Sequence, residues 1–197
     1  PCTRSGRWYE ANRSDVTWTN EEVEQLRKVA SPHLMRAVDL ALLTCMRRGD
    51  LLKLKWEDVK SDCVRYTTSK SRGKITVELP LYPALKKLLD GFPRECEFVL
   101  ANSRKEQWRS GFSSSWNKAI KKAGLTKHFH DLRGTAVTKL KVNGFRADEI
   151  ALVAGWTEKS VESILKRYVS REEQFAALKN RMNGALALQS EQESAKG

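Results

Sequence analysis

Hydrophobic residues recur every three or four positions through most of the chain, which is the spacing of amphipathic helices. The first such stripe, Val23, Leu26 and Val29, follows Thr19 and Asn20, two residue types that cap helix N-termini. Similar stripes follow, separated by glycine, proline and polar turns. The pattern predicts helices over residues 20–29, 34–44, 51–56, 82–90, 112–123, 130–143, 148–154, 158–168 and 171–188.

The period changes to two between residues 63 and 80. Apolar and polar residues alternate over 64–68 and again over 75–79, and the turn between them, 69–74, is polar and basic. This alternation predicts a β-hairpin, and the apolar run 98–100 predicts a third strand. The predicted fold is therefore α+β and mainly α-helical, with a small three-stranded antiparallel sheet.

The 197 residues fit one domain with flanks and are enough to bury a core. Residues 1–18 are polar and basic without a sustained period, which indicates an arm or interdomain linker with Trp8 and Trp18 as docking points. The predicted domain covers 19–188, and the polar residues 189–197 predict a disordered tail. The first residue is not Met, so we expect the sequence to be a piece of a longer protein.

Lysine and arginine number 36 against 24 aspartates and glutamates, which gives a formal net charge of +12 and a pI of about 9.7. This balance favours a polyanionic partner. No apolar run approaches the roughly 18 residues of a membrane span, and no signal segment is visible. The four cysteines form no C-x-x-C pair, so we expect reduced structural thiols, no metal site and a cytoplasmic protein.

Two positions concentrate groups that bind anions. In a helix, His130 and Arg133 lie on one face, where an arginine fork grips phosphate oxygens and a histidine moves a proton near neutral pH. Arg47, Arg48 and Asp50 lie between two apolar segments, where charges are costly unless they are paired or face a ligand. Each pattern also fits a structure without function, as a surface coincidence or as a solvated turn with an internal ion pair.

Basic residues gather at two further surfaces that suit contact with a nucleic-acid backbone, although solvated surfaces often have the same composition. They are Lys70, Arg72 and Lys74 at the hairpin tip, and Lys118, Lys121 and Lys122 on one helix. Tyr168 falls on the apolar face of its predicted helix with Val161 and Leu165. That position also suits an ordinary core tyrosine.

Taken together, these segments resemble the catalytic domain of the tyrosine recombinases, the phage-integrase family of DNA breaking and rejoining enzymes. Five boxes match in order within residues 19–188. They are the first arginine box at 44–52, the lysine hairpin at 69–80, the H-x-x-R box at 130–133, the His-or-Trp box at 154–156 and the nucleophile position at 167–168. The chain departs from the family pattern at Cys45, where many members have Gly, and at Asp50, where most have Glu.

The resemblance implies a role for each matching residue. Tyr168 attacks a DNA phosphodiester and forms a covalent 3′-phosphotyrosine, which frees a 5′ hydroxyl. The other expected catalytic residues are Arg47 and Arg133 as phosphate clamps, Lys70 as general acid with Lys74 as its alternative, His130 as acid/base, Trp156 as an orienting indole and Asp50 as support. Arg48 and the basic residues of the hairpin tip and the helix are expected to contact DNA.

The resemblance also implies partners. These are double-stranded DNA at attachment or recombination sites, other copies of the chain in a tetrameric synapse, and accessory DNA-bending or directionality factors. The helix at 171–188 is expected to dock on a neighbouring protomer. Strand exchange needs no metal, ATP or other cofactor, because the bond energy is kept in the phosphotyrosine. The box variants favour the integrase of a phage or an integrative element.

Alternatives of other classes remain. His128 and His130 resemble the paired histidines of metal-dependent tyrosine relaxases and nucleases, but there the histidines alternate on a strand, whereas here a helical pattern follows them directly. A non-catalytic basic DNA-binding module would have the same charge and would keep Tyr168 in its core. A type IB topoisomerase shares the active-site logic, but is expected to need an upstream clamp.

Overall fold

The computed structural model describes residues 17–69, 75–168 and 178–179. Several predictions fall outside these residues. They concern the arm 1–16 with Trp8, the hairpin tip with Lys70, Arg72 and Lys74, nearly all of the helix at 171–188, and the tail 189–197. The backbone of Tyr168 is described as the last residue of a helix, but its side chain is not.

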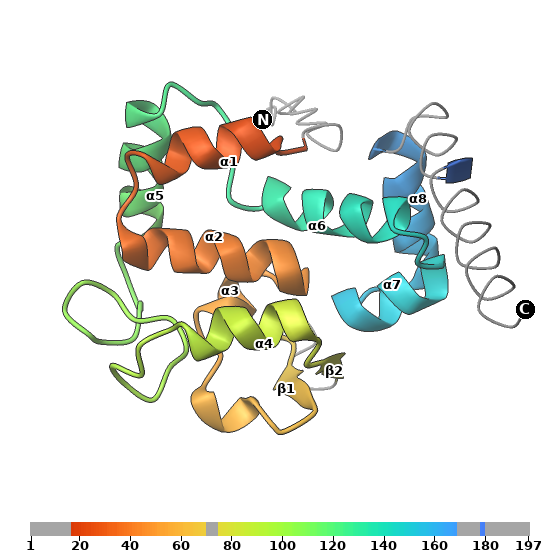
Figure 1. The fold of residues 1–197 in the computed structure, drawn as a ribbon, viewed down its shortest axis with the longest axis horizontal. Coiled ribbons are helices and arrows are strands. Elements are labelled where there is room, and N and C mark those ends of the chain that lie inside the picture. Colours follow the sequence, from red (N-terminus) through yellow and green to blue (C-terminus); the bar gives the residue numbers. More distant parts are fainter. Residues whose placement is uncertain (1–16, 70–74, 169–177, 180–197) are drawn as a thin grey trace, which may run out of the picture.

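Most of the described chain is helical, as predicted. The elements are α1 (Asn20–Arg27), α2 (Pro32–Thr44), α3 (Arg48–Leu51), the 3-10 turn η1 (Trp56–Asp58), β1 (Cys63–Thr67), β2 (Thr76–Pro80), α4 (Pro83–Asp90), α5 (Phe112–Lys122), α6 (Asp131–Val142), α7 (Ala147–Ala154) and α8 (Glu158–Tyr168) (Figure 1). A capping box begins α1, because the Thr19 hydroxyl accepts from the Glu22 N–H (3.2 Å) and the Glu22 carboxylate from the Thr19 N–H (2.9 Å).

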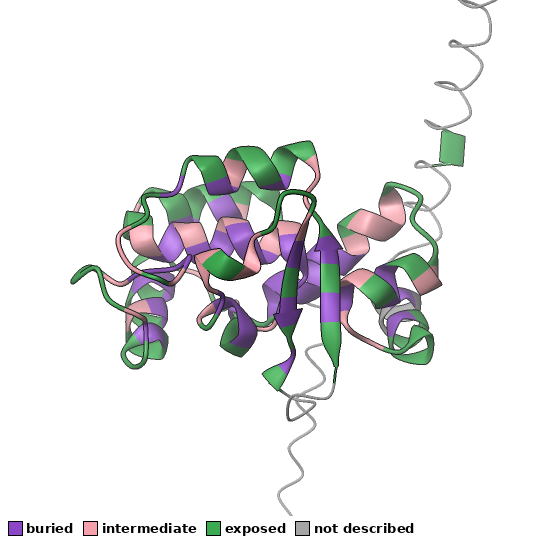
Figure 2. Cartoon of the chain, turned by 90° about the horizontal axis from the view of Figure 1, so that it is seen from below, coloured by how far each residue is buried: buried purple, intermediate pink, exposed green. Residues whose placement is uncertain are grey.

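The sheet of the described residues has two strands, so the predicted hairpin is confirmed and the predicted third strand is wrong. The strands are antiparallel, with Tyr66 opposite Val77. Both of these side chains are buried, whereas their neighbours Arg65 and Glu78 face outward and form an ion pair of 2.8 Å. Figure 2 shows this alternation of buried and exposed residues along both strands.

Residues 98–100 do not join the sheet because they run beside the segment that follows α3. The Val99 N–H donates to the Leu54 carbonyl (2.9 Å), and the Trp56 N–H donates to the Glu97 carbonyl (3.0 Å). This pairing is confined to an isolated bridge and is too short to be a strand. The helix predicted over 51–56 is also wrong: α3 covers Arg48–Leu51, and the backbone of Leu54 and Trp56 bonds across to the other segment instead of along a helix.

Two hydrophobic clusters fill the interior. The larger cluster joins α1, α2, α4, α5 and the hairpin, and the smaller one joins α6, α7 and α8. Helix α6 contributes Leu132 to the larger cluster and Val137 to the smaller one, so it links the two. In Figure 1, α2 runs through the middle of the molecule, and it packs against both α4 and α6. Within the described residues, every helix is too short or too polar to cross a membrane.

Cys45 ends α2 in the left-handed conformation, with φ 54° and ψ 14°. Glycine adopts this conformation at little cost, which accounts for the glycine of many family members at this position. The Cys45 side chain is fully buried in the smaller cluster, and burial raises the pKa of its thiol to about 12. The left-handed turn leads the chain out of α2 and into Arg47.

Gly155 ends α7 and is also left-handed, with φ 60°. A Cβ atom at this position would lie 2.8 Å from Cγ2 of Val77 and 3.4 Å from Cγ2 of Thr68. Only glycine therefore lets the end of α7 contact the inner face of the hairpin without displacing a side chain. The contact sets the position of the hairpin relative to the start of α8.

Gly155→Ala should lower the free energy of unfolding by about 2 kcal/mol or more, because it adds a steric overlap to the backbone strain. Urea unfolding measures this loss. Gly124→Ala is the matched control, since Gly124 has φ +67° and nothing within 4 Å of an added Cβ. Equal losses in the two variants would contradict the proposed overlap, and Val77→Ala should recover part of the loss only in the Gly155→Ala background.

Candidate active site

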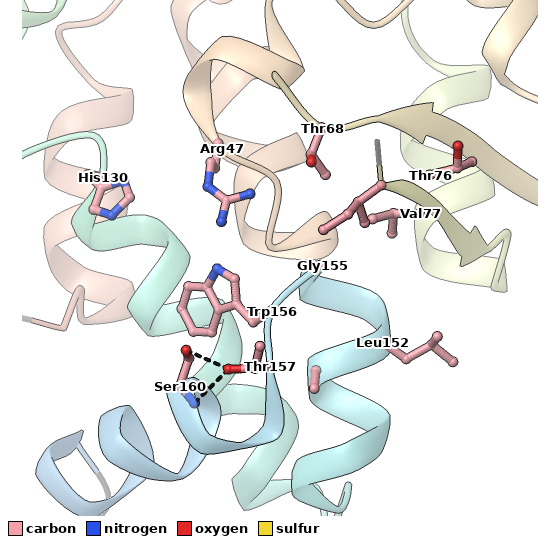
Figure 3. Close-up of a pocket in the computed structure, with 12 residues that line it drawn as sticks. Arg47, Thr68, Thr76, Val77, His130, Leu152, Gly155, Trp156, Thr157 and Ser160 are labelled. Atoms are coloured by element: carbon pink, nitrogen blue, oxygen red, sulfur yellow. Dashed lines mark hydrogen bonds between the residues drawn. The ribbon is translucent and has the colours of Figure 1, made fainter. Parts of the chain in front are cut away.

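A cavity of about 690 Å³ opens where the start of α3, the hairpin, the start of α6 and the junction of α7 and α8 meet. Three residues predicted for catalysis line it, namely Arg47, His130 and Trp156. The other lining residues are Thr68, Ile75, Thr76, Val77, Ala151, Leu152, Gly155, Thr157 and Ser160. Figure 3 shows the Arg47 guanidinium and the His130 ring side by side, with the nitrogen edge of the Trp156 indole turned toward Arg47.

Arg47 reaches the cavity because it is the extended residue that directly precedes α3 (φ −70°, ψ 147°). Its side chain is half-buried, and none of the ion pairs in the described part of the chain includes it. A guanidinium without a carboxylate partner at a cavity wall offers its donors to an anion. The structure therefore favours the anion-binding interpretation of Arg47 over a turn with an internal ion pair.

Arg133 lies one turn along α6 from His130 and is almost fully buried, with 2% of its surface exposed. It lies behind Trp156, with its guanidinium carbon 4.3 Å from the centroid of the indole ring, and it donates a hydrogen bond to the Ala154 carbonyl. Of the two predicted arginine clamps, Arg47 thus forms part of the cavity wall, while Arg133 stands one layer deeper.

Burial and the charge of Arg47 lower the pKa of Arg133 to about 10, so the group is still cationic at pH 7. The Arg133 Nε atom is buried and has no hydrogen-bond partner among the described residues. An unsatisfied buried donor is costly. Arg133 therefore keeps one donor without a partner behind Trp156, among the described residues.

Asp50, the predicted supporting acid, is buried in α3 with 4% of its surface exposed. Its Oδ1 atom accepts a hydrogen bond from the Ser69 N–H (2.8 Å). Its Oδ2 atom is buried without a hydrogen-bond partner in the part of the chain that the structure describes. Asp50 thus ties α3 to the end of the first hairpin strand, immediately before Lys70.

His130 precedes α6, and its ring forms part of the cavity wall although the residue as a whole stays exposed. Partial removal from water lowers the pKa of His130, and the positive charges of Arg133 and Arg47 lower it further. The ring is therefore neutral at pH 7. A neutral imidazole is able to accept a proton, which is what the acid/base role requires.

Sequence reasoning missed two residues near the site. Tyr66 is buried beneath the cavity, and burial raises the pKa of its phenol to about 12, against the opposing charge of Arg133. It stays a neutral phenol under ordinary conditions. Thr68, two residues further along the same strand, lines the cavity. The alternation of the hairpin is the signal that places both side chains on its inner face.

Sequence reasoning also missed how Trp18 is attached. It was expected only as a docking point of the arm, but it is buried and bonds to the segment that holds His130. Its backbone N–H donates to the Thr135 hydroxyl (2.8 Å), and its indole N–H donates to the His128 carbonyl (3.4 Å). Its ring meets Trp116 edge-on, at a centroid distance of 5.7 Å.

The predicted DNA contacts that the structure describes divide into two groups. Arg48 is exposed next to the cavity and donates to the Ser113 hydroxyl (3.1 Å). Lys118, Lys121 and Lys122 are exposed on α5, away from the cavity wall. Within the described residues, no three His, Cys, Asp or Glu side chains are grouped so as to hold a metal ion.

The protein is a helical domain with a small antiparallel hairpin, and a cavity lined by Arg47 and His130 lies between the helices and the hairpin. Residues 17–174 match the phage integrase family, and the chain belongs to that family.

Individual relatives agree with this assignment. The chain is 27% identical to the shufflon-specific DNA recombinase of Escherichia coli over 154 residues, which are 76% of this chain and 38% of the relative. It is 31% identical to the integrase of Enterobacteria phage 434 over 142 residues, 62% of this chain and 40% of that protein. The chain thus spans about 40% of the length of these relatives.

Among solved structures, the fold is similar to a lambda integrase tetramer bound to a Holliday junction. The TM-score is 0.60 and the identity 25%, over 72% of this chain and 47% of the other. This likeness confirms the predicted fold class, apart from the third strand.

The titration of His130 tests the electrostatics of the site. Its midpoint, followed by NMR of the imidazole protons, should lie below 6.5, and Arg47→Gln should raise it toward that value because one neighbouring charge is removed. Arg104→Gln, a change in a loop that does not line the cavity, is the control and should leave it unchanged. A midpoint insensitive to Arg47→Gln would contradict this account.

The same shift makes stability depend on pH. Because the pKa of His130 is depressed in the folded state, the unfolded state binds the proton more readily. The contribution of His130 to stability is therefore complete above pH 6.5 and is lost as the pH falls through the folded-state pKa. In urea unfolding at pH 5 and pH 7.5, His130→Gln should reduce the difference in unfolding free energy between the two pH values.

Replacement of Trp156 tests the contact that covers Arg133. Trp156→Ala should lower the free energy of unfolding by about 1–3 kcal/mol, because it removes ring packing and the cation–π contact. Trp156→Phe keeps a ring over the guanidinium and should cost less than half as much. Thermal and urea unfolding give both values, and equal losses would show that the ring does not stabilise Arg133.

Proposed function

We propose that this chain contains the catalytic domain of a site-specific DNA recombinase, most of it within residues 19–188, from a phage or an integrative element. The observation that carries the proposal is the convergence of Arg47, His130 and Trp156 on one cavity. These residues lie far apart in the sequence and belong to three separate boxes of the family pattern. Family membership over residues 17–174 supports the same function.

The proposed reaction is a transesterification. The phenol oxygen of Tyr168 bonds to the phosphorus of a DNA phosphodiester, and the bond from phosphorus to the 5′ oxygen breaks. His130 takes up the phenol proton, and Lys70 gives a proton to the leaving 5′ oxygen. Attack by a 5′ hydroxyl of another strand reverses these bond changes and completes the exchange without a metal ion or ATP.

The described side chains supply the electrostatic part of this reaction. Arg47 would bind a non-bridging phosphate oxygen at the cavity wall, toward which Trp156 turns the nitrogen edge of its indole. Charge that builds up on those oxygens in the transition state is stabilised by such fixed donors, each worth about 10²–10³ in rate. Arg133 strengthens the positive potential from behind the indole. Asp50 supports the start of the hairpin turn through its bond to the Ser69 N–H.

The proposed partner is double-stranded DNA, and the proposed working unit is a homo-oligomer that forms a tetramer on recombination sites. The net charge of +12 and the similarity to an integrase tetramer bound to a Holliday junction support both points. The helix at 171–188 would dock on a neighbouring protomer. Accessory DNA-bending factors and a cytoplasmic location in the host belong to the same proposal.

Covalent capture tests the nucleophile. The chain is incubated in EDTA with short duplexes that have a randomised centre and nicks in one strand, so that cleavage near a nick releases a short fragment and traps the adduct. We expect a protein–DNA adduct on a denaturing gel, its loss in Tyr168→Phe, and unchanged DNA binding by that variant. Sequencing of the captured DNA then gives the cleavage position.

The other outcomes identify the rival functions. Cleavage that needs magnesium and fails in EDTA would establish a metal-dependent nuclease. DNA binding that is unaffected by Tyr168→Phe, with no adduct from either protein, would instead support a non-catalytic binding module.

A further inference from the structure

A second cavity, of about 530 Å³, adjoins the first one. Arg47 and His130 line both cavities, so these two residues stand on the boundary between them. The second cavity extends toward α3 and the first two turns of α5. Its other lining residues are Arg48, Gly49, Ser113, Trp116, Asn117, His128 and Phe129.

The two cavities differ in chemistry. Beyond Trp156 and the shared pair, the first cavity is lined by apolar side chains such as Val77, Ile75 and Leu152 and by four hydroxyl side chains, with no further cationic group among the described residues. The hydroxyl side chains are Thr68, Thr76, Thr157 and Ser160. Besides the shared Arg47 and His130, the second is lined by four polar or cationic side chains, and no carboxylate lines it among the described residues. These four are Arg48, Ser113, Asn117 and His128. Such a lining suits an anion with several oxygen atoms.

The cationic groups of the second cavity are held in place. Arg48 donates to the Ser113 hydroxyl (3.1 Å), and its guanidinium carbon lies 6.0 Å from the centroid of the Phe112 ring. None of the ion pairs in the described ranges includes Arg48, so its charge is not neutralised there. Helix α5 begins beside this cavity, where Ser113 lines it, and the positive end of its dipole adds to the attraction for an anion.

The opposite wall is equally fixed. The N–H of His128 donates to the Asp131 carboxylate (2.7 Å), and the His128 carbonyl accepts from the indole of Trp18 (3.4 Å). Phe129 packs edge-on against Trp116 at a centroid distance of 5.2 Å and forms the floor with it. The turn that presents His130 to the first cavity therefore presents His128 to the second one.

We propose that the second cavity binds the sugar-phosphate group next to the scissile phosphate, with Arg48 as the main contact to the flanking phosphate. This inference rests on the proposed function, because it takes the scissile phosphate to lie between Arg47 and His130. A continuous strand with one phosphate there extends to both sides of it, and the second cavity adjoins that boundary. The second cavity adds the positive charge of Arg48, whereas the described lining of the first adds no cationic group beyond the shared pair.

A double-mutant cycle between protein and DNA tests this subsite. Duplexes that contain the captured cleavage site are made with a neutral methylphosphonate at each phosphate flanking the scissile one, in turn. Their dissociation constants are measured over a range of salt concentrations for the Tyr168→Phe chain, which leaves the DNA uncut, with and without Arg48→Gln. Arg104→Gln is the control, because it removes the same charge from a loop that lines neither cavity.

On unmodified DNA, Arg48→Gln should weaken binding about tenfold and reduce the slope of log K against log salt by about 1, as expected for one lost phosphate contact. At one flanking position, the methylphosphonate should weaken DNA binding by the chain with Arg48 by a similar factor. The same methylphosphonate should hardly change DNA binding by the Arg48→Gln chain. Arg104→Gln should remain sensitive to the methylphosphonate at that position.

Additive effects of Arg48→Gln and the methylphosphonate at every flanking position would overturn the subsite. So would equal losses from Arg48→Gln and Arg104→Gln on unmodified DNA, since these indicate general attraction to the duplex. The proposed function is judged separately, by the adduct at Tyr168 on unmodified DNA. An adduct combined with additive effects would leave the recombinase function in place and reject only the second cavity as its subsite.

Discussion

The geometry of the site depends on one buried cation. The Arg133 guanidinium lies between the Trp156 ring and the Ala154 carbonyl, with almost no exposed surface. A buried charge without such partners costs several kcal/mol, so these contacts and the packing of α6 must form together. Because Trp156 lies between α7 and α8, the contact fixes the start of α8 relative to α6. It thereby sets the direction of the helix that ends at Tyr168, relative to the turn that presents His130.

The hairpin is anchored to this frame near its turn. Gly155 permits the end of α7 to touch Val77, and the Asp50 carboxylate accepts from the Ser69 N–H just after the first strand. Both contacts are close to the cavity, and both join segments from different parts of the chain. The cavity is lined by segments that are distant in the sequence, namely the start of α3, the hairpin, the start of α6 and the junction of α7 and α8, and the packing between these segments holds the cavity together.

Periodicity predicted the helices and the hairpin because they depend on local spacing and caps, which Thr19 and Gly155 illustrate. Periodicity failed at 98–100. These three apolar residues bond to the segment after α3 and not to a strand of the hairpin, and tertiary packing decides which of the two they meet. The motif pattern named Arg47, His130 and Trp156, and the structure brings these three together at one cavity. It did not indicate that Arg133 lies behind the indole, because the depth of a side chain depends on what covers it. The second cavity could not be predicted either, because its lining residues come from three distant segments and share no local spacing.

Trp18 has a mechanical consequence. Its bonds to the Thr135 hydroxyl and to the His128 carbonyl connect the first described residues to α6 and to the turn before it, and its ring packs in the larger hydrophobic cluster. Directional bonds fix the orientation of Trp18 as well as its depth. A substitution at Trp18 would therefore disturb the turn that carries His128 and His130, although it changes neither histidine.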